Sequence, residues 1–341
     1  MNKNRASFSK TFPWLLLFLA VGYLFYYFRT DIFSRPVPKT ETLTEETLPQ
    51  VKEEKKEEFT GGLYYFEAGT GGSEIFRLDL LTNEKKLVFT DKDENLKIKQ
   101  IGGSVTKKKK VLLAVGEEKS VFASELYFVS LDGKATKEKL EFSLVSPQPP
   151  SVSADGEQIL YIVFNNAEKD FGFMLNIVDR NGQNKRQLAK SAVTISKPVF
   201  QDNGRLVAYV VSQPEGDELW QVGVEEAVPQ KIRGFTNQTV VSLVWSNDGY
   251  LVSLGEKISG GVKNTEIYLL GKDGQELSKL TENKLILDSL QQSGVLMAYL
   301  SYDFAGGSRK VGVDGDIVVM NLKDKKTKTY QKATQLLGLI L

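Results

Sequence analysis

The chain of 341 residues contains no cysteine and no histidine. Without them it cannot form a disulfide bond, a Ser-His-Asp or Cys-His triad, or a metal site with thiolate or imidazole ligands. An excess of either charge is also missing, because 44 basic and 43 acidic residues leave a net charge of +1. That balance provides no basic surface for nucleic acid. The sequence therefore excludes peptidases of the triad type and predicts no nucleic-acid partner.

Long apolar runs are scarce, and the one that is long enough to span a bilayer covers residues 12–28. Its sequence, FPWLLLFLAVGYLFYYF, carries no charge and has about the minimum length of a transmembrane helix. Basic residues precede it and aromatic residues lie at both ends, a pattern that keeps the N-terminus cytoplasmic and exports the rest. We predict a cytoplasmic tail over residues 1–11 and a signal anchor in the lipid bilayer over residues 12–28. The alternative is a signal peptide cleaved after the small residues 20–22, but the apolar residues that follow favour an uncleaved anchor.

Apolar residues are also few between residues 29 and 60, where Pro, Thr, Glu and Lys dominate and EEKKEE occupies residues 53–58. Such a segment has too little apolar surface to offset the entropy lost on ordering it. We therefore predict a flexible stalk over residues 29–60, with a reach on the order of 30 Å. A charged helix over residues 44–58 is the alternative.

One strand-like pattern recurs from residue 61 onward. Its copies are EIFRLDL at Glu74, ELYFVSL at Glu125, MLNIVDR at Met174, ELWQVGV at Glu218, EIYLLGK at Glu266 and DIVVMNL at Asp316. Successive copies start 51, 49, 44, 48 and 50 residues apart. These spacings are close to the roughly 40–50 residues of one propeller blade. Six copies therefore predict six blades.

The segments around each copy support this prediction. A nearly continuous apolar run precedes each copy, as expected of a strand that is covered on both faces, and a more polar run follows. Asp, Asn and Gly mark tight turns between the first two strands of most blades. The tail TQLLGLIL, residues 334–341, matches the inner strand that blade 1 lacks. We predict an all-β fold over residues 61–341, a six-bladed β-propeller closed by the C-terminal strand and preceded by one N-terminal transmembrane helix.

The turn and strands in WSNDGYLVSL and TEIYLLGKDGQELSKLTE, between Trp245 and Glu282, and in SADGEQILYIVF from Ser153, resemble the S-P-D-G repeats of TolB-type propellers. Similar repeats build the propellers of prolyl oligopeptidases. The resemblance covers residues 61–341 and implies the fold of this region. Because propellers carry many unrelated activities, function must be argued from a site.

Motifs for bound phosphate or metal are incomplete. The Gly-rich residues 69–72 and 306–307 lack the Lys-Ser/Thr of a phosphate loop, so we expect hairpin turns there. Residues 91–95 begin like a calcium loop but lack its sixth-position Gly and twelfth-position Glu. Four consecutive lysines, residues 107–110, are expected to form a solvated turn. We predict no catalytic residue, no cofactor and no metal.

These observations favour a protein-binding or scaffold module of the bacterial cell envelope, TolB-like, exposed outside the cytoplasm and bound to an envelope protein or a peptide. A glycan is the other ligand class. The alternative function is a carbohydrate-binding or carbohydrate-active propeller with Asp and Glu at the central channel. Glycoside hydrolysis needs two carboxylates that face each other across the sugar. The predicted inner strands supply one acid, Asp288, so we predict a protein that is not an enzyme.

Binding residues are expected in the loops between the second and third strands, which meet on one face of a propeller. The predicted loops are residues 165–171, 213–217, 256–264 and 302–315. The longest contains aromatic and charged side chains. We predict partner-binding roles for Tyr302, Phe304, Arg309 and Asp314.

Overall fold

The structure is a computed structural model of the chain. It describes residues 59–69, 72–91, 96–102, 105–117, 125–133, 136–144, 146–167, 171–201, 204–259, 261–275, 277–282, 285–302 and 314–341. The predicted cytoplasmic tail, the predicted anchor and nearly all of the predicted stalk lie outside these ranges. Within them, no helix combines the length and the apolar character needed to cross a membrane.

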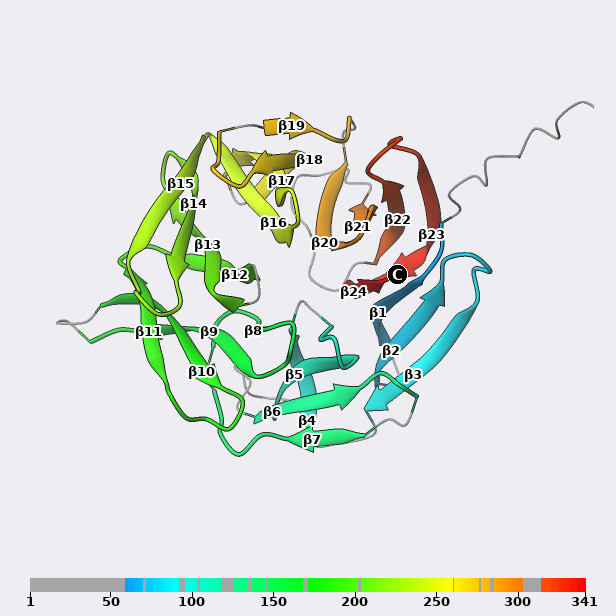
Figure 1. Ribbon diagram of the computed structural model, residues 1–341, viewed down its shortest axis with the longest axis horizontal. Helices are drawn as coiled ribbons and strands as arrows, with labels where there is room; N and C mark the ends of the chain where they lie inside the picture. Colours follow the sequence, from blue (N-terminus) through cyan, green and yellow to red (C-terminus); the bar gives the residue numbers. More distant parts are fainter. Residues whose placement is uncertain are drawn as a thin grey trace, which may run out of the picture. The chain divides into compact units, whose positions relative to one another are not determined.

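The strands of the described residues form six four-stranded antiparallel sheets, which are the blades of a ring (Figure 1). From the centre of the ring to its rim, blade 1 consists of β24 (Gln335–Ile340), β1 (Gly62–Gly69), β2 (Gly72–Asp79) and β3 (Lys85–Asp91); blade 2 of β4 (Leu96–Ile101), β5 (Lys110–Glu117), β6 (Glu125–Ser130) and β7 (Lys137–Lys139); and blade 3 of β8 (Ser151–Val152), β9 (Gln158–Asn165), β10 (Gly172–Asp179) and β11 (Arg186–Ser191). Blade 4 consists of β12 (Ile195–Gln201), β13 (Leu206–Gln213), β14 (Gly216–Gly223) and β15 (Pro229–Thr236); blade 5 of β16 (Gln238–Ser246), β17 (Gly249–Ile258), β18 (Gly261–Gly271) and β19 (Leu277–Lys279); and blade 6 of β20 (Ile286–Ser293), β21 (Leu296–Tyr302), β22 (Gly315–Asn321) and β23 (Thr327–Ala333). The predicted six-bladed propeller is confirmed.

The C-terminal strand closes the ring. β24 pairs antiparallel with β1, with Ile340 opposite Gly62 and Leu339 opposite Leu63. Leu337, in the middle of β24, is fully buried. The tail therefore supplies the inner strand of blade 1, as predicted, and the pairing covers an edge that would otherwise be open.

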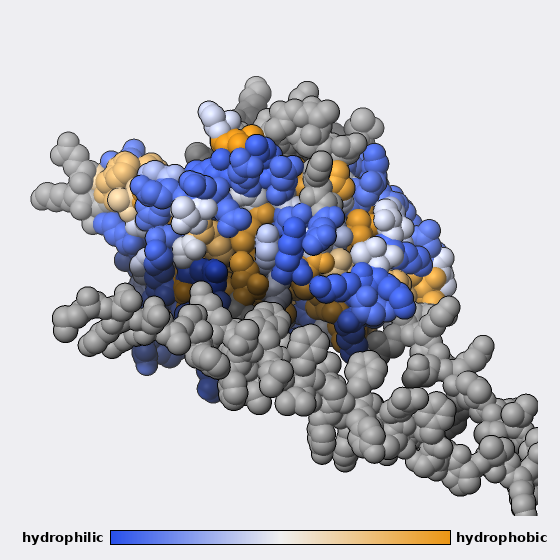
Figure 2. All heavy atoms as spheres, turned by 90° about the horizontal axis from the view of Figure 1, so that it is seen from above, coloured by the Kyte–Doolittle hydropathy of each residue, from blue (hydrophilic) through white to orange (hydrophobic). Residues whose placement is uncertain are grey.

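The apolar core is divided among the gaps between blades. Each of its six clusters takes side chains from two neighbouring blades. The second strands supply more of these side chains than the first, third or fourth strands do, and all seven residues of β21 are buried. The rim strands are more polar, as in β15. The side of the molecule seen in Figure 2 is mostly hydrophilic, with apolar residues visible among the hydrophilic ones. This gradient from the second strand to the fourth is the one that the sequence predicted.

Most inner strands contain a β-bulge. Registers shift in β4, β12, β16 and β20 and between β1 and β24. In β12 and β20 the first bulged residues, Lys197 and Ser289, have left-handed backbones with φ of 51° and 58°. A bulge changes the direction of a side chain, so these positions are re-aimed relative to a regular strand. β8 is the shortest inner strand, because Pro149 and Pro150 directly before it cannot donate ladder hydrogen bonds.

The turns between second and third strands are partly tighter than predicted. Residues 213–217 and 256–264 were expected to be loops, but β13 and β14 are joined through residues 214–215 alone and β17 continues to Ile258. Gly216 makes the first of these turns possible. Its φ is 136°, and a Cβ added there would clash with the carbonyl oxygen of Phe235.

Candidate functional site in the central channel

The inner strands of the six blades lie around the centre of the ring (Figure 1). Residues of these strands and of the segments next to them line a channel with a volume of about 620 Å³. It is the natural candidate for a binding site, because ligand pockets in proteins are typically concave spaces of about 300–1,000 Å³. Its described lining residues are Ile101, Val105, Gln148, Pro149, Pro150, Ser151, Val152, Ala154, Lys197, Pro198, Val199, Phe200, Val241, Ser242, Leu243, Val244, Trp245, Asp288, Ser289, Leu290, Gln291, Gln292, Gln335, Leu336, Gly338 and Leu339.

Polar side chains in the channel wall connect neighbouring blades. The Leu290 N–H of blade 6 donates to the Ser242 hydroxyl of blade 5 over 3.1 Å. In the same way, the Leu336 N–H of blade 1 donates to the Ser289 hydroxyl of blade 6 over 3.2 Å. The Gln335 amide then donates to the Ile101 carbonyl of blade 2 over 3.4 Å. These hydroxyl and amide groups therefore have a role in the fold.

Lys197 differs from these side chains. It is half-buried in the channel wall, and within the described residues its ammonium group makes no hydrogen bond and no ion pair. Enclosure by protein lowers the pKa of Lys197 below its ordinary value, and the charges of Asp288 and Asp217 oppose that shift. The charged form of Lys197 is therefore only partly compensated by its surroundings.

Both carboxylates near Lys197 are held by the backbone. Asp217, which is 3% exposed, accepts a hydrogen bond of 2.9 Å from the Val240 N–H of the next blade. Asp288 accepts one of 2.6 Å from the Ser289 N–H, directly after it in the chain. Among the described residues that line the channel, Lys197 and Asp288 are the charged ones. The channel thus offers one cation and one anion in a wall of amides, hydroxyls and apolar groups.

Two of the four loop residues proposed from the sequence lie within the described structure. Tyr302 is 2% exposed and belongs to the core cluster between blades 6 and 1, so packing accounts for its side chain. Asp314 is exposed and accepts a hydrogen bond of 2.7 Å from the Thr334 hydroxyl. Phe304 and Arg309 lie outside the described residues. A partner-binding role for the four residues stays a prediction.

The sequence pointed to Asp288 but not to Lys197. An alignment of the inner strands on their bulges brings out Lys197. In that alignment ISKPVF in β12 matches LDSLQQ in β20, and Lys197 takes the position of Ser289. The inner strand β4, LKIKQI, also contains lysines at positions 97 and 99, so residue type alone would not single out Lys197. The bulges themselves leave no clear pattern in the sequence, so the alignment is visible only in the structure.

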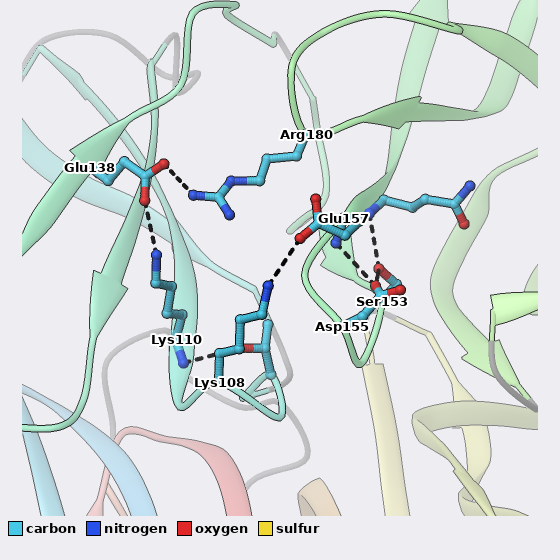
Figure 3. Close-up of polar contacts among 9 residues, drawn as sticks. Lys108, Lys110, Glu138, Ser153, Asp155, Glu157 and Arg180 are labelled. Atoms are coloured by element: carbon cyan, nitrogen blue, oxygen red, sulfur yellow. Dashed lines mark hydrogen bonds and ion pairs between the residues drawn. The ribbon is translucent and has the colours of Figure 1, made fainter.

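A second cleft, of about 760 Å³, lies between blades 2 and 3 and contains several acidic residues. Figure 3 shows Glu138 between Lys110 and Arg180, with 2.9 Å separating the Lys110 ammonium and the Glu138 carboxylate. Lys108 in turn forms an ion pair of 3.3 Å with Glu157. The turn of four lysines therefore contacts acids of the same protein, in agreement with the predicted solvated turn. Among the described residues, no group of three or more acidic side chains is arranged to hold a metal ion.

No protein-family model matches the sequence, and a search of curated proteins also found no match. Solved structures do match. A TolB structure from Agrobacterium tumefaciens has a TM-score of 0.61 at 15% identity, over 79% of this chain and 94% of that one. TolB from Acinetobacter baumannii has a TM-score of 0.56 at 14% identity, over 82% of this chain and 67% of that one.

A chain in the crystal structure of a nidogen/laminin complex also matches, with a TM-score of 0.56 at 12% identity, over 82% of this chain and 97% of that one. At such identities a likeness establishes the fold and leaves function to the site. The described part of this chain therefore has a six-bladed β-propeller fold of the TolB type.

Proposed function

We propose that this protein is a membrane-anchored, extracytoplasmic scaffold of the bacterial cell envelope that binds a protein segment in its central channel. The observation that carries the proposal is the channel, with its volume of about 620 Å³ and its mixed wall of amide, hydroxyl and aromatic side chains. Amides and hydroxyls both donate and accept hydrogen bonds, so such a wall can serve the N–H and C=O groups of an extended peptide. The aromatic side chains Phe200 and Trp245 add apolar surface for its side chains.

Two further observations favour binding of a protein over catalysis. Glycoside hydrolysis needs a pair of facing carboxylates, and the described channel wall contributes Asp288. One structural neighbour comes from a complex of two proteins, nidogen and laminin. The membrane anchor and the position outside the cytoplasm rest on residues 12–28 and on the basic residues before them.

Site-specific photocrosslinking in native membranes tests the proposed binding mode. A photoreactive benzoylphenylalanine is placed at Val241, which lines the channel, or at Leu87, which is 46% exposed on the rim strand β3. We expect a discrete crosslinked protein from Val241 and none from Leu87. Equal crosslinking at both positions, or none at Val241, would overturn a protein ligand in the channel. Retention of glycan without crosslinked protein would favour the carbohydrate alternative.

Two companion measurements address the remaining parts of the proposal. External protease should digest the propeller in intact spheroplasts while an N-terminal tag stays protected; a protected propeller would contradict the extracytoplasmic position. If the long loop also contacts the partner, alanine at both Phe304 and Arg309 should reduce the crosslink from Val241.

A further inference from the structure

We infer that Lys197 is a recognition residue for a carboxylate group, so that the ligand of the channel is an acidic segment rather than a neutral or basic one. The inference rests on the proposed function for the place of the ligand. It adds the chemistry by which the ligand is selected. The argument has three parts, which concern the position of Lys197, its backbone and its charged neighbours.

The position of Lys197 gives the side chain no role in the fold. Ser289 occupies the same place in the bulge of blade 6, and its hydroxyl accepts a backbone hydrogen bond from blade 1. An ammonium group has three donors and no acceptor, so Lys197 cannot act in this way. The bond from the Val240 N–H to Asp217 does not replace this contact, because it recurs in the next blade as the bond from the Leu287 N–H to the Thr265 hydroxyl. Blade 4 therefore has a lysine in the channel wall where blade 6 has the hydroxyl of Ser289.

The backbone at Lys197 is unfavourable for a lysine. Its φ of 51° lies in the left-handed region, which is sterically unfavourable for an L-residue other than glycine or asparagine. Asparagine tolerates this conformation better than lysine. Ser289 shares this conformation at the bulge of β20, with a φ of 58°, so the strain comes from the bulge. Lys197 differs in that its side chain makes no hydrogen bond within the described residues, which leaves its ammonium group available to a ligand.

Lys197 is the cation of the described channel wall, and its charge favours an anionic group on the ligand. Desolvation destabilises its ammonium form, and Asp288 and Asp217 compensate only in part, since the pKa remains lowered. A ligand carboxylate at the ammonium group would supply the missing compensation. A phosphate dianion would be repelled more strongly by the two aspartates, because it carries about twice the charge at neutral pH. A monoanion therefore fits this environment best.

The test uses the full-length protein in detergent and two short probes, acetyl-Gly-Asp-Gly-amide and its Asn counterpart. The protein is treated with a limiting amount of an amine-reactive acetylating reagent, and the rate of acetylation of each lysine is measured by mass spectrometry. A carboxylate beside an ammonium group raises its pKa by about one unit or more, so labelling of Lys197 should slow roughly tenfold with the acidic probe. Lys86, exposed on the rim strand β3, is the internal control and should be labelled at the same rate throughout.

Variants separate recognition from folding. Lys197→Ser places at the bulge of β12 the residue type that β20 has there, and Lys197→Asn is the second choice if the serine variant does not fold. Either variant should keep the thermal unfolding midpoint of the wild type or raise it, and should lose binding of the acidic probe in calorimetry. Unchanged binding of the acidic probe would overturn the assignment of Lys197.

The outcomes also distinguish the inference from the proposed function. Equal protection of Lys197 by both probes, better protection by inorganic phosphate, or protection by neither probe would overturn the carboxylate; a crosslink from Val241 would still support the binding of a protein. Protection by the acidic probe without any crosslink from Val241 would support the carboxylate site and contradict a protein partner.

Discussion

Shortening Leu337 to alanine should weaken the whole propeller, because this side chain lies where the ring closes. Leu337 is 0% exposed and packs with Tyr64, Val111 and other side chains in the cluster between blades 1 and 2. Leu-to-Ala changes at fully buried sites typically cost 2–5 kcal/mol, the sum of lost transfer energy and the cavity that remains. We expect a loss of about 3 kcal/mol in the free energy of unfolding.

The assay is equilibrium unfolding in urea, followed by tryptophan fluorescence and by far-ultraviolet circular dichroism. Trp220 and Trp245 report from blades 4 and 5, away from the closure between β24 and β1. The matched control is Leu341→Ala, since Leu341 is 54% exposed at the end of the same tail. It should change the free energy of unfolding by less than about 0.5 kcal/mol.

The reasoning requires that both probes move to lower urea together. If Leu337→Ala left the fluorescence transition where it is in the wild type and changed only a small part of the dichroism signal, the tail would merely fray. The pairing of β24 with β1 would then not hold the ring together. A shift as large for Leu341→Ala would equally refute the role of burial.

Two further predictions concern a turn and an ion-pair group. Gly216→Ala should lower the free energy of unfolding by more than about 2 kcal/mol, because the backbone is left-handed there and the new Cβ would meet the Phe235 carbonyl; Gly223→Ala, at the other end of β14 with its nearest neighbour at 3.8 Å, is the control and should cost about 1 kcal/mol or less in urea unfolding. The Lys110 ammonium and the Arg180 guanidinium hold the pKa of Glu138 below its ordinary value of 4.5. The ionised Glu138 carboxylate therefore stabilises the fold fully above pH 4.5, and this stabilisation is lost as the pH falls through the lowered pKa. Between pH 6 and pH 3 the urea midpoint should therefore fall less in Glu138→Gln than in the wild type, by an amount worth at most about 1 kcal/mol for so exposed a group, and an equal fall in both proteins would contradict the role of this carboxylate.

The repeated strand pattern predicted the blades because each copy occupies the same position in its blade and is buried in the same way. Apolar runs such as VLLAVG at Val111 became second strands covered on both faces, and the tail at residues 334–341 filled the vacant inner position. The prediction of loops failed where it relied on the local composition of a short segment. Residues 256–264 contain the Gly and Lys that loops often have, yet the pairing of β17 with β18 continues through most of them.

The candidate site was harder to predict than the fold. Tyr302 is an aromatic residue of the kind that often binds partners, but it is the last residue of β21, a strand that is buried throughout, and it belongs to the core. Lys197 is the opposite case, because a lysine in a short strand suggests a strand at the solvent-exposed edge of a sheet. Its place in the channel depends on a bulge in β12 that shifts the register after Ser196. Such a shift is set by pairing with a neighbouring strand, which a local pattern does not record.

The division of the core among the gaps between blades means that the unit of sequence repetition is not the unit of stability. A blade taken alone has two apolar faces, and each face contributes only part of the side chains of the cluster next to it. The smallest piece with a complete core is therefore made of the facing halves of two blades, offset by half a repeat from the pattern in the sequence. Gain or loss of one blade in evolution would have to join two faces that had never packed together. Growth of such a ring by copying a blade thus depends on how alike the faces are, and less on how alike the strands are.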